Sequence, residues 1–279
     1  MSRNYYYLVT SLPTLRLDDY KEPYRVDEFV QELKDNLSVL HYGWVRDVLS
    51  IYDNANIIDV LCADGIRGEH CRGNWTHDEL EQLLETPGAF IEELPRDNYL
   101  REFFEIYTNE KKQSGESSRR DLEELVSGLY YRQMRAHPNA FIRKYYRFDA
   151  DLRNVLTALN IRRFSMPKSG FIGIDEDEVI TRLRTSSAAD FGLSGELTYL
   201  GALNEVFARP DLVQVEKFID QLRWHKIEEI NTFNYFEIDV LLGYLVKLML
   251  VERWIRMDRQ KGRENLFKLI KTEKEEIYQ

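Results

Sequence analysis

The sequence has few of the residues that anchor a chain in a membrane or staple it covalently. It contains two cysteines, Cys62 and Cys71, among 279 residues, and one pair is too few to replace a hydrophobic core, so we expect reduced thiols. Its longest apolar stretch, Ile238 to Trp254, is shorter than a membrane span and includes four charged residues. The first ten residues lack the apolar block of a signal peptide. We therefore expect a cytoplasmic protein that reaches a membrane only through a partner.

Motifs for common enzyme chemistry are also missing. The sequence has no G-x-x-x-x-G-K-[ST], G-x-S-x-G, H-E-x-x-H or G-x-G-x-x-G pattern, which argues against P-loop nucleotide hydrolysis and the other chemistries that these motifs support. We expect no catalytic residues, no cofactor and no small-molecule substrate. The alternative is an enzyme that uses a cleft between helical bundles, which would need convergent titratable groups such as His70, His77 or an acidic cluster.

Cations are outnumbered, and the net charge of -10 argues against general binding of nucleic acid. One segment is an exception, because residues 130–163 carry eight cations and two anions, interleaved with aromatic residues. This pattern fits a solvated basic face over an aromatic core, a single-stranded nucleic-acid site, or a docking face for an acidic protein. We prefer the solvated face, because helical spacing explains the aromatics. A docking face would use Arg143, Lys144 and Arg147.

Two further clusters have simpler explanations than a metal site. Cys62, His70, Cys71 and His77 lie close in sequence, but the cysteines are nine apart and lack the close pairing of structural zinc sites. We expect a polar surface loop there and no bound metal. The acidic run from Asp175 to Glu178 is typical of a helix start, where negative charge complements the helix dipole.

The pattern of apolar residues predicts an all-α fold. Val26, Phe29, Val30 and Leu33 recur at three- and four-residue steps, which places them on one face of a helix. Further helix starts are predicted by capping pairs or acidic caps, namely Thr76 with Glu79, Ser118 with Asp121, and Asp175. The opening segment, Tyr5 to Leu12, is aromatic and β-branched and ends at Pro13, which favours a short extended segment.

An internal echo is the most informative feature. Residues 53–61 and 151–159 both fit D-x-x-N-[IV]-[IL]-x-x-L, 98 residues apart, and a weaker match at 252–256 follows 101 residues later. The near-equal spacing suggests three related helical units, although such short matches also arise by chance. On a helix, the Asp and Asn share one face, where they could fix helix register or bind a neighbouring backbone. The resulting candidate residues are Asp53, Asn56, Asp151, Asn154, Glu252 and Arg256, the last two as an inward-facing i,i+4 pair.

These segments resemble a family of V-type and A-type ATPase subunits that carries the letter C, or d in eukaryotes, and in particular bacterial proteins encoded beside V-type ATPase genes. The resemblance is carried by residues 5–13, 53–56, 241–245 and 252–256. The family usually begins with a helix, and the tyrosine-rich opening departs from that pattern. The resemblance implies three similar helical bundles about a pseudo-threefold axis. We place them at residues 1–110, 111–185 and 186–279.

The resemblance also implies a function. The protein would be a non-catalytic connector that couples the central-stalk subunits of a bacterial V-type ATPase to the membrane proteolipid ring, peripheral at the inner membrane. It would carry torque for ion transport without binding nucleic acid. The main alternative is a helical scaffold or adaptor with unrelated partners, in which the three units need no threefold relation.

Overall fold

The structure is a computed structural model. It describes residues 5–19, 24–62, 72–76, 78–80, 88, 91–92, 94–113, 118–167, 169–173 and 177–277, and for 110–113 and 258–277 it describes the helical backbone alone. Helices and their connections make up all of these residues, with no strand among them, so the predicted all-α class is confirmed. None of the helices in these ranges is long and apolar enough to cross a membrane.

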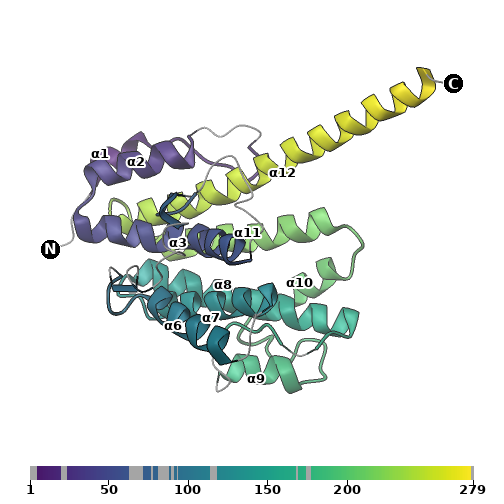
Figure 1. Ribbon diagram of the computed structural model, residues 1–279, viewed down its shortest axis with the longest axis horizontal. Helices are drawn as coiled ribbons and strands as arrows, with labels where there is room; N and C mark the ends of the chain where they lie inside the picture. The colour runs from purple at the N-terminus through teal and green to yellow at the C-terminus, as the bar shows by residue number, and fades with distance from the viewer. Residues whose placement is uncertain are drawn as a thin grey trace. The chain divides into compact units, whose positions relative to one another are not determined.

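Figure 1 shows the labelled helices. Their bounds are α1 Tyr6–Ser11, α2 Val26–Asn36, α3 Val39–Leu61, α6 Tyr99–Gln113, α7 Arg119–Arg135, α8 Ala140–Phe164, α9 Glu178–Thr185, α10 Leu200–Phe207, α11 Leu212–Asn231 and α12 Ile238–Ile277. The chain divides into two compact units: a terminal unit of residues 1–38 and 227–279, and a central unit of residues 39–226. This division joins the two ends of the chain, and the arrangement of three bundles about an axis stays a prediction.

Side-chain caps start several helices where the sequence predicted them. The Ser118 hydroxyl accepts the Asp121 N–H at the start of α7. Thr76 and Glu79 form a reciprocal capping box, in which the Glu79 carboxylate accepts the Thr76 N–H at 2.7 Å. Helix α9 starts after Asp177, whose carboxylate accepts the Val179 N–H. Asp175, the residue predicted to start this helix, lies outside the described residues.

The opening segment is helical, which corrects the expected extended segment. Residues Tyr6–Ser11 form α1, with Leu8 buried. The Tyr5 N–H donates to the Phe236 carbonyl at 2.7 Å, and the rings of Tyr6 and Phe236 lie 4.3 Å apart. Packing against the start of α12 therefore outweighs the β-propensity of the aromatic and β-branched residues.

The terminal unit has its core between α2 and α12. Phe29 and Leu33 on α2 are fully buried, as are Leu241 and Leu245 on α12. The Phe29 ring meets the edge of Tyr244 with centroids 5.0 Å apart. Burying a side chain of this kind stabilises a fold by roughly 1.5 to 3 kcal/mol, so the apolar face of α2 that the sequence predicted is what holds this unit together.

The central unit is built around α7 and α8, which lie side by side (Figure 1). A four-residue connection joins them, as is typical of antiparallel neighbours. One side of α8 packs Leu152 and Val155 against a cluster from α9, α10 and α11 that includes Leu200. The other side carries buried tyrosines. The aromatics between 130 and 146 are therefore core residues, and they include Tyr130, Tyr131, Phe141, Tyr145 and Tyr146.

Candidate functional site

The central unit contains an open cleft with a volume of about 1260 Å³. Its walls are the first half of α3, residues 74–75, residues 94–98, the start of α6 and the end of α7. Its apolar lining includes Val39, Leu40, Trp44 and Trp75. Its charged lining comprises Arg46, Arg96, Arg101 and Arg132 together with Asp47, Asp97, Glu102 and Glu105. Tryptophan and arginine are the residue types that dominate protein-protein contacts.

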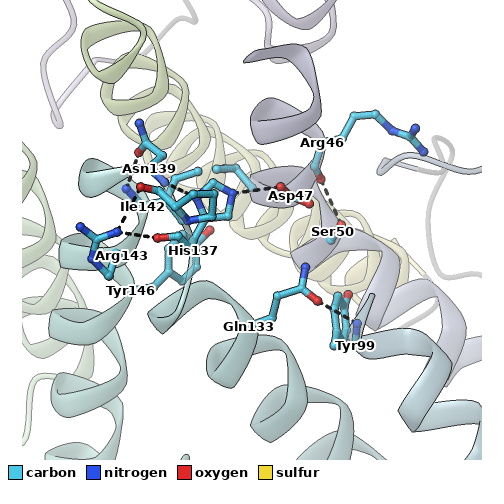
Figure 2. A network of polar contacts seen from close by, with 12 residues as sticks. Arg46, Asp47, Ser50, Tyr99, Gln133, His137, Asn139, Ile142, Arg143 and Tyr146 are labelled. Carbon is cyan, nitrogen blue, oxygen red and sulfur yellow. Dashed lines mark hydrogen bonds and ion pairs between the residues drawn. The ribbon is translucent and has the colours of Figure 1, made fainter. Parts of the chain in front are cut away.

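His137 closes one end of the cleft, and both of its ring nitrogens are engaged inside the protein (Figure 2). The Asn139 N–H donates to Nδ1 at 3.0 Å. That bond leaves Nε2 to carry the proton, and Nε2 lies 3.1 Å from the Asp47 carboxylate. The ring is 5% exposed and meets the edge of Trp44. His137 therefore ties α3 to the connection between α7 and α8.

Two more contacts hold the same corner. The Arg143 guanidinium donates to the carbonyl oxygens of His137 at 2.6 Å and Pro138 at 3.1 Å (Figure 2). Beneath it, the Tyr130 hydroxyl lies 2.8 Å from the Tyr146 hydroxyl. Burial raises the pKa of Tyr130 well above its ordinary value. These phenols therefore stay neutral and act as fixed hydrogen-bonding groups.

Beside the cleft, the first copy of the sequence echo holds a loop against α3. The Asp53 carboxylate accepts the backbone N–H of Asn74 at 2.7 Å and its side-chain N–H at 2.6 Å. The Asn56 side chain donates to the Arg72 carbonyl at 2.6 Å. Gly73, between these contacts, has φ +128°. We call Asp53, Asn56 and residues 72–74 the first latch.

The Asp53 side chain is fully buried. Burial raises its pKa to about 6, against the lowering effect of the hydrogen bonds from Asn74. Asn74 also bonds to α3 through the Arg46 carbonyl, which its side chain reaches at 2.9 Å. Because Asn74 lines the cleft, the first latch fixes part of the cleft wall.

The second copy holds a loop against α8 through a matching contact. Asn154 donates to the Ile172 carbonyl at 2.8 Å and accepts the Ile172 N–H at 2.7 Å. The next residue, Gly173, has φ +139°. Burial raises the pKa of Asp151 to about 6, with the charge of Arg135 opposing it. We call Asp151, Asn154 and residues 171–173 the second latch. In both latches the asparagine binds the residue before a glycine with positive φ.

The third, weaker echo lies on α12 in the terminal unit. Glu252 is 2% exposed, whereas Arg256 is exposed. The two residues therefore differ in burial, and Glu252 alone meets the expectation of an inward-facing pair.

The predicted basic stretch uses most of its charge internally. Arg132 pairs with Glu102, and Arg135 pairs with Asp177 at 2.9 Å. Within this stretch Lys144 and Arg147 are exposed. A nucleic-acid site of stacked bases would need exposed rings, and the rings between 130 and 146 are buried. The pattern is that of the predicted solvated face over an aromatic core.

A buried ionic cluster was not found by sequence reasoning. Asp149 on α8 binds Arg223 on α11 at 2.7 Å and Arg153 at 3.1 Å, and the Tyr131 hydroxyl donates to it. Burial acts to raise the pKa of Asp149, but the two guanidinium groups outweigh it and hold the pKa well below its usual range. The 74-residue separation of Asp149 and Arg223 leaves no local signal.

Of the residues weighed as metal ligands, His70, Cys71 and His77 lie outside the described residues, and Cys62 is half-buried just after α3. Among the side chains that the structure describes, no group of three His, Cys, Asp or Glu could hold a metal ion.

The fold and the cleft define an all-helical protein with an arginine- and tryptophan-lined contact surface. The chain belongs to the family described as "Protein of unknown function (DUF2764)", whose model matches residues 1–277. It is also similar to an uncharacterized protein of Chlamydia muridarum, with 24% identity over 197 residues that cover 69% of this chain and 70% of that protein.

Proposed function

We propose that this protein is a non-catalytic connector in the central stalk of a V-type ATPase and that the cleft of the central unit receives a segment of a partner protein. The observation that carries the docking role is the contrast between the cleft's lining and its histidine. Tryptophan, leucine and arginine line the cleft, while His137 uses both ring nitrogens inside the protein. A general base would have to present a ring nitrogen to a bound molecule.

The composition of the cleft suits a protein partner. Its arginines and carboxylates are four of each, so it does not select a ligand by charge alone. Val39 and Leu40 are 92% and 63% exposed at its edge. Exposed aliphatic residues beside Trp44 offer the apolar anchor around which interface energy usually concentrates, with the charged residues as a polar rim.

The two latches support a mechanical role. Each fixes a loop to the flank of a long helix through side-chain bonds to the backbone. Such bonds keep a docking surface in one geometry before the partner arrives, which lowers the entropic cost of association. A part that transmits torque needs this kind of rigidity.

The ATPase assignment rests on the resemblance of residues 5–13, 53–56, 241–245 and 252–256 to the ATPase family named above. The helical start of the chain supports it, because α1 removes the departure from the family pattern. The proposal places the protein in the cytoplasm, docked at the inner membrane on the stalk and the proteolipid ring.

The test is affinity purification of the tagged protein from gently solubilised membranes of its own host. We expect stalk and proteolipid subunits in fixed ratio. A cleft variant, Leu40→Glu with Arg96→Glu, changes two exposed lining residues and should lose the stalk subunits. The matched control is Val213→Glu with Arg209→Glu, an exposed pair outside the cleft, which should keep them.

If the wild-type protein is recovered alone or with unrelated partners, the ATPase assignment is wrong and a scaffold with other partners replaces it. If the ATPase subunits are recovered equally with the cleft variant, the assignment stands and the docking role of the cleft is wrong.

A further inference from the structure

The terminal unit displays a second surface that the cleft does not explain. Four aromatic side chains are exposed on α1 and on the turn between α11 and α12: Tyr6 at 56%, Tyr7 at 77%, Phe233 at 85% and Tyr235 at 65%. We call these four residues the aromatic patch. Exposed aromatic residues gathered in this way mark interaction sites, because their removal from water is favourable and each offers a large rigid contact.

Backbone and ring contacts join the two segments of the patch. The Tyr5 N–H bonds to the Phe236 carbonyl, and the Tyr6 and Phe236 rings pack together. The aromatic patch is therefore continuous across the start of the chain and the turn that precedes α12.

The turn is fixed by its own side chains. Asn231 donates to the Asp239 carbonyl at 3.0 Å, and Asn234 donates to the Asn231 side chain at 3.0 Å. The Glu237 carboxylate accepts the N–H groups of Tyr235 at 2.8 Å and Phe236 at 2.9 Å. The aromatic side chains thus project from an ordered backbone, so a partner would not have to order the turn on binding.

The charge around the aromatic patch is negative. Residues 228–246 contain four acidic residues and no Lys or Arg, and residues 5–15 contain no charge. The bonds from the N–H groups of Phe236 and Tyr235 lower the pKa of Glu237, so this carboxylate stays ionised beside the exposed rings. Aromatic faces and carboxylates together attract cations, through cation-π contact and through charge.

We propose that the aromatic patch is a docking surface for an Arg- or Lys-bearing segment of a partner protein. The negative charge argues against a lipid surface, since cytoplasmic leaflets are anionic and repel carboxylates. It argues equally against two copies of the patch meeting face to face. The proposal stands apart from the ATPase assignment, because it concerns the terminal unit and uses none of the cleft residues.

The test is fluorescence anisotropy of the full chain with a short labelled peptide of alternating Arg and Gly, and with the same peptide carrying Glu in place of Arg. We expect the Arg peptide to bind, and its affinity to fall by about tenfold in Phe233→Ser with Tyr235→Ser. The control is Phe164→Ser, which removes a 63% exposed ring of the central unit and should leave the affinity unchanged. Raising the salt to about 1 M should weaken the wild-type complex.

Three results would overturn the proposal. The first is equal affinity of the Arg peptide for the patch variant and for wild type, which would assign its binding to charge elsewhere on the chain. The second is flotation of the wild type, but not the patch variant, with phosphatidylcholine vesicles, which would make the patch a lipid contact. The third is patch-dependent dimerisation in analytical ultracentrifugation, which would make the partner a second copy of this chain.

Discussion

The two latches share an asparagine contact and differ in what surrounds the loop glycine. In the first latch a Cβ on Gly73 would lie 2.1 Å from the Asp53 carboxylate. In the second latch a Cβ on Gly173 would lie 2.6 Å from the terminal methyl of Ile180. The first loop is therefore seated on a polar group beside the cleft, and the second is seated on the apolar side of α9.

This difference separates what the two copies of the sequence pattern have in common from what each does locally. Asn56 and Asn154 both bind the residue before the glycine. Asp53 binds its own loop directly, whereas Asp151 lies among the charges of Arg135 and Asp177. The asparagine thus has one structural task in both copies, and the aspartate has a local one. Of the two latches, the first contributes to a surface that a partner could reach.

The largest effects should come from the glycines. Gly73→Ala should destabilise the central unit by about 3 kcal/mol, because a φ of +128° is strained for alanine and the new methyl group overlaps a carboxylate that Asn74 holds in place. Gly173→Ala should cost about 2 kcal/mol, because the same strain applies but the Ile180 methyl can rotate away. Urea unfolding followed by tryptophan fluorescence gives both values.

Gly43→Ala is the control, because Gly43 lies within α3 with open space at its Cβ position. It should be neutral or slightly stabilising, since alanine favours a helix over glycine by about 1 kcal/mol. If Gly173→Ala proved more costly than Gly73→Ala, the carboxylate would not be the stiffer neighbour and the contrast between the latches would be lost.

Smaller effects should come from the asparagines. Asn154→Ala should cost about 2 to 3 kcal/mol, because Asn154 is 1% exposed and its loss leaves both polar groups of Ile172 without this partner. Asn56→Ala should cost about 1 kcal/mol, because Asn56 is half-buried and water can replace its bond to Arg72.

The same unfolding experiment applies, with Asn36→Ala as the control. Asn36 is exposed and bonds locally to the Glu32 carbonyl, so its replacement should change stability by less than about 0.5 kcal/mol. Equal losses for Asn56→Ala and Asn154→Ala would mean that the exposure of the first latch does not weaken it.

Much of this architecture could be predicted from the sequence, because local rules determine it. Apolar spacing located α2, and capping pairs located the starts of α7 and of the helix after Thr76. The echo singled out Asn56 and Asn154, and binding to a neighbouring backbone was one of the two roles expected of it.

Long-range partners were out of reach of the sequence. The loops that the latches hold lie 16 and 18 residues beyond the asparagines, and no local rule gives the path of the chain between them. His137 and Asp47 are 90 residues apart, so the corner of the cleft had no signal. The helical start of the chain was missed because Phe236 lies more than 200 residues away.

The smallest effect should be a dependence of stability on pH that the two aspartates share. Burial raises the pKa of Asp53 and of Asp151 to about 6, from 3.8. The folded state therefore binds more protons than the unfolded state between about pH 4 and 6, and the free energy of unfolding falls as pH rises through this range. Asp53→Asn and Asp151→Asn should each reduce that slope, by about 1 kcal/mol over the range. Urea midpoints at a series of pH values measure it.

Asp190→Asn provides a control of opposite sign. Hydrogen bonds from Ser194 and Gly192 lower the pKa of Asp190, so its contribution is present at neutral pH and is lost as pH falls below the ordinary range for Asp. Its replacement should leave the slope between pH 4 and 6 unchanged. If Asp53→Asn alone flattened the slope, the proton uptake would belong to the first latch, and the cleft wall that Asn74 forms would be the part of the molecule that responds to acid. A flat slope in the wild type would show instead that the bonds from Asn74 offset the burial of Asp53, and that the two latches are alike in charge as well as in their asparagines.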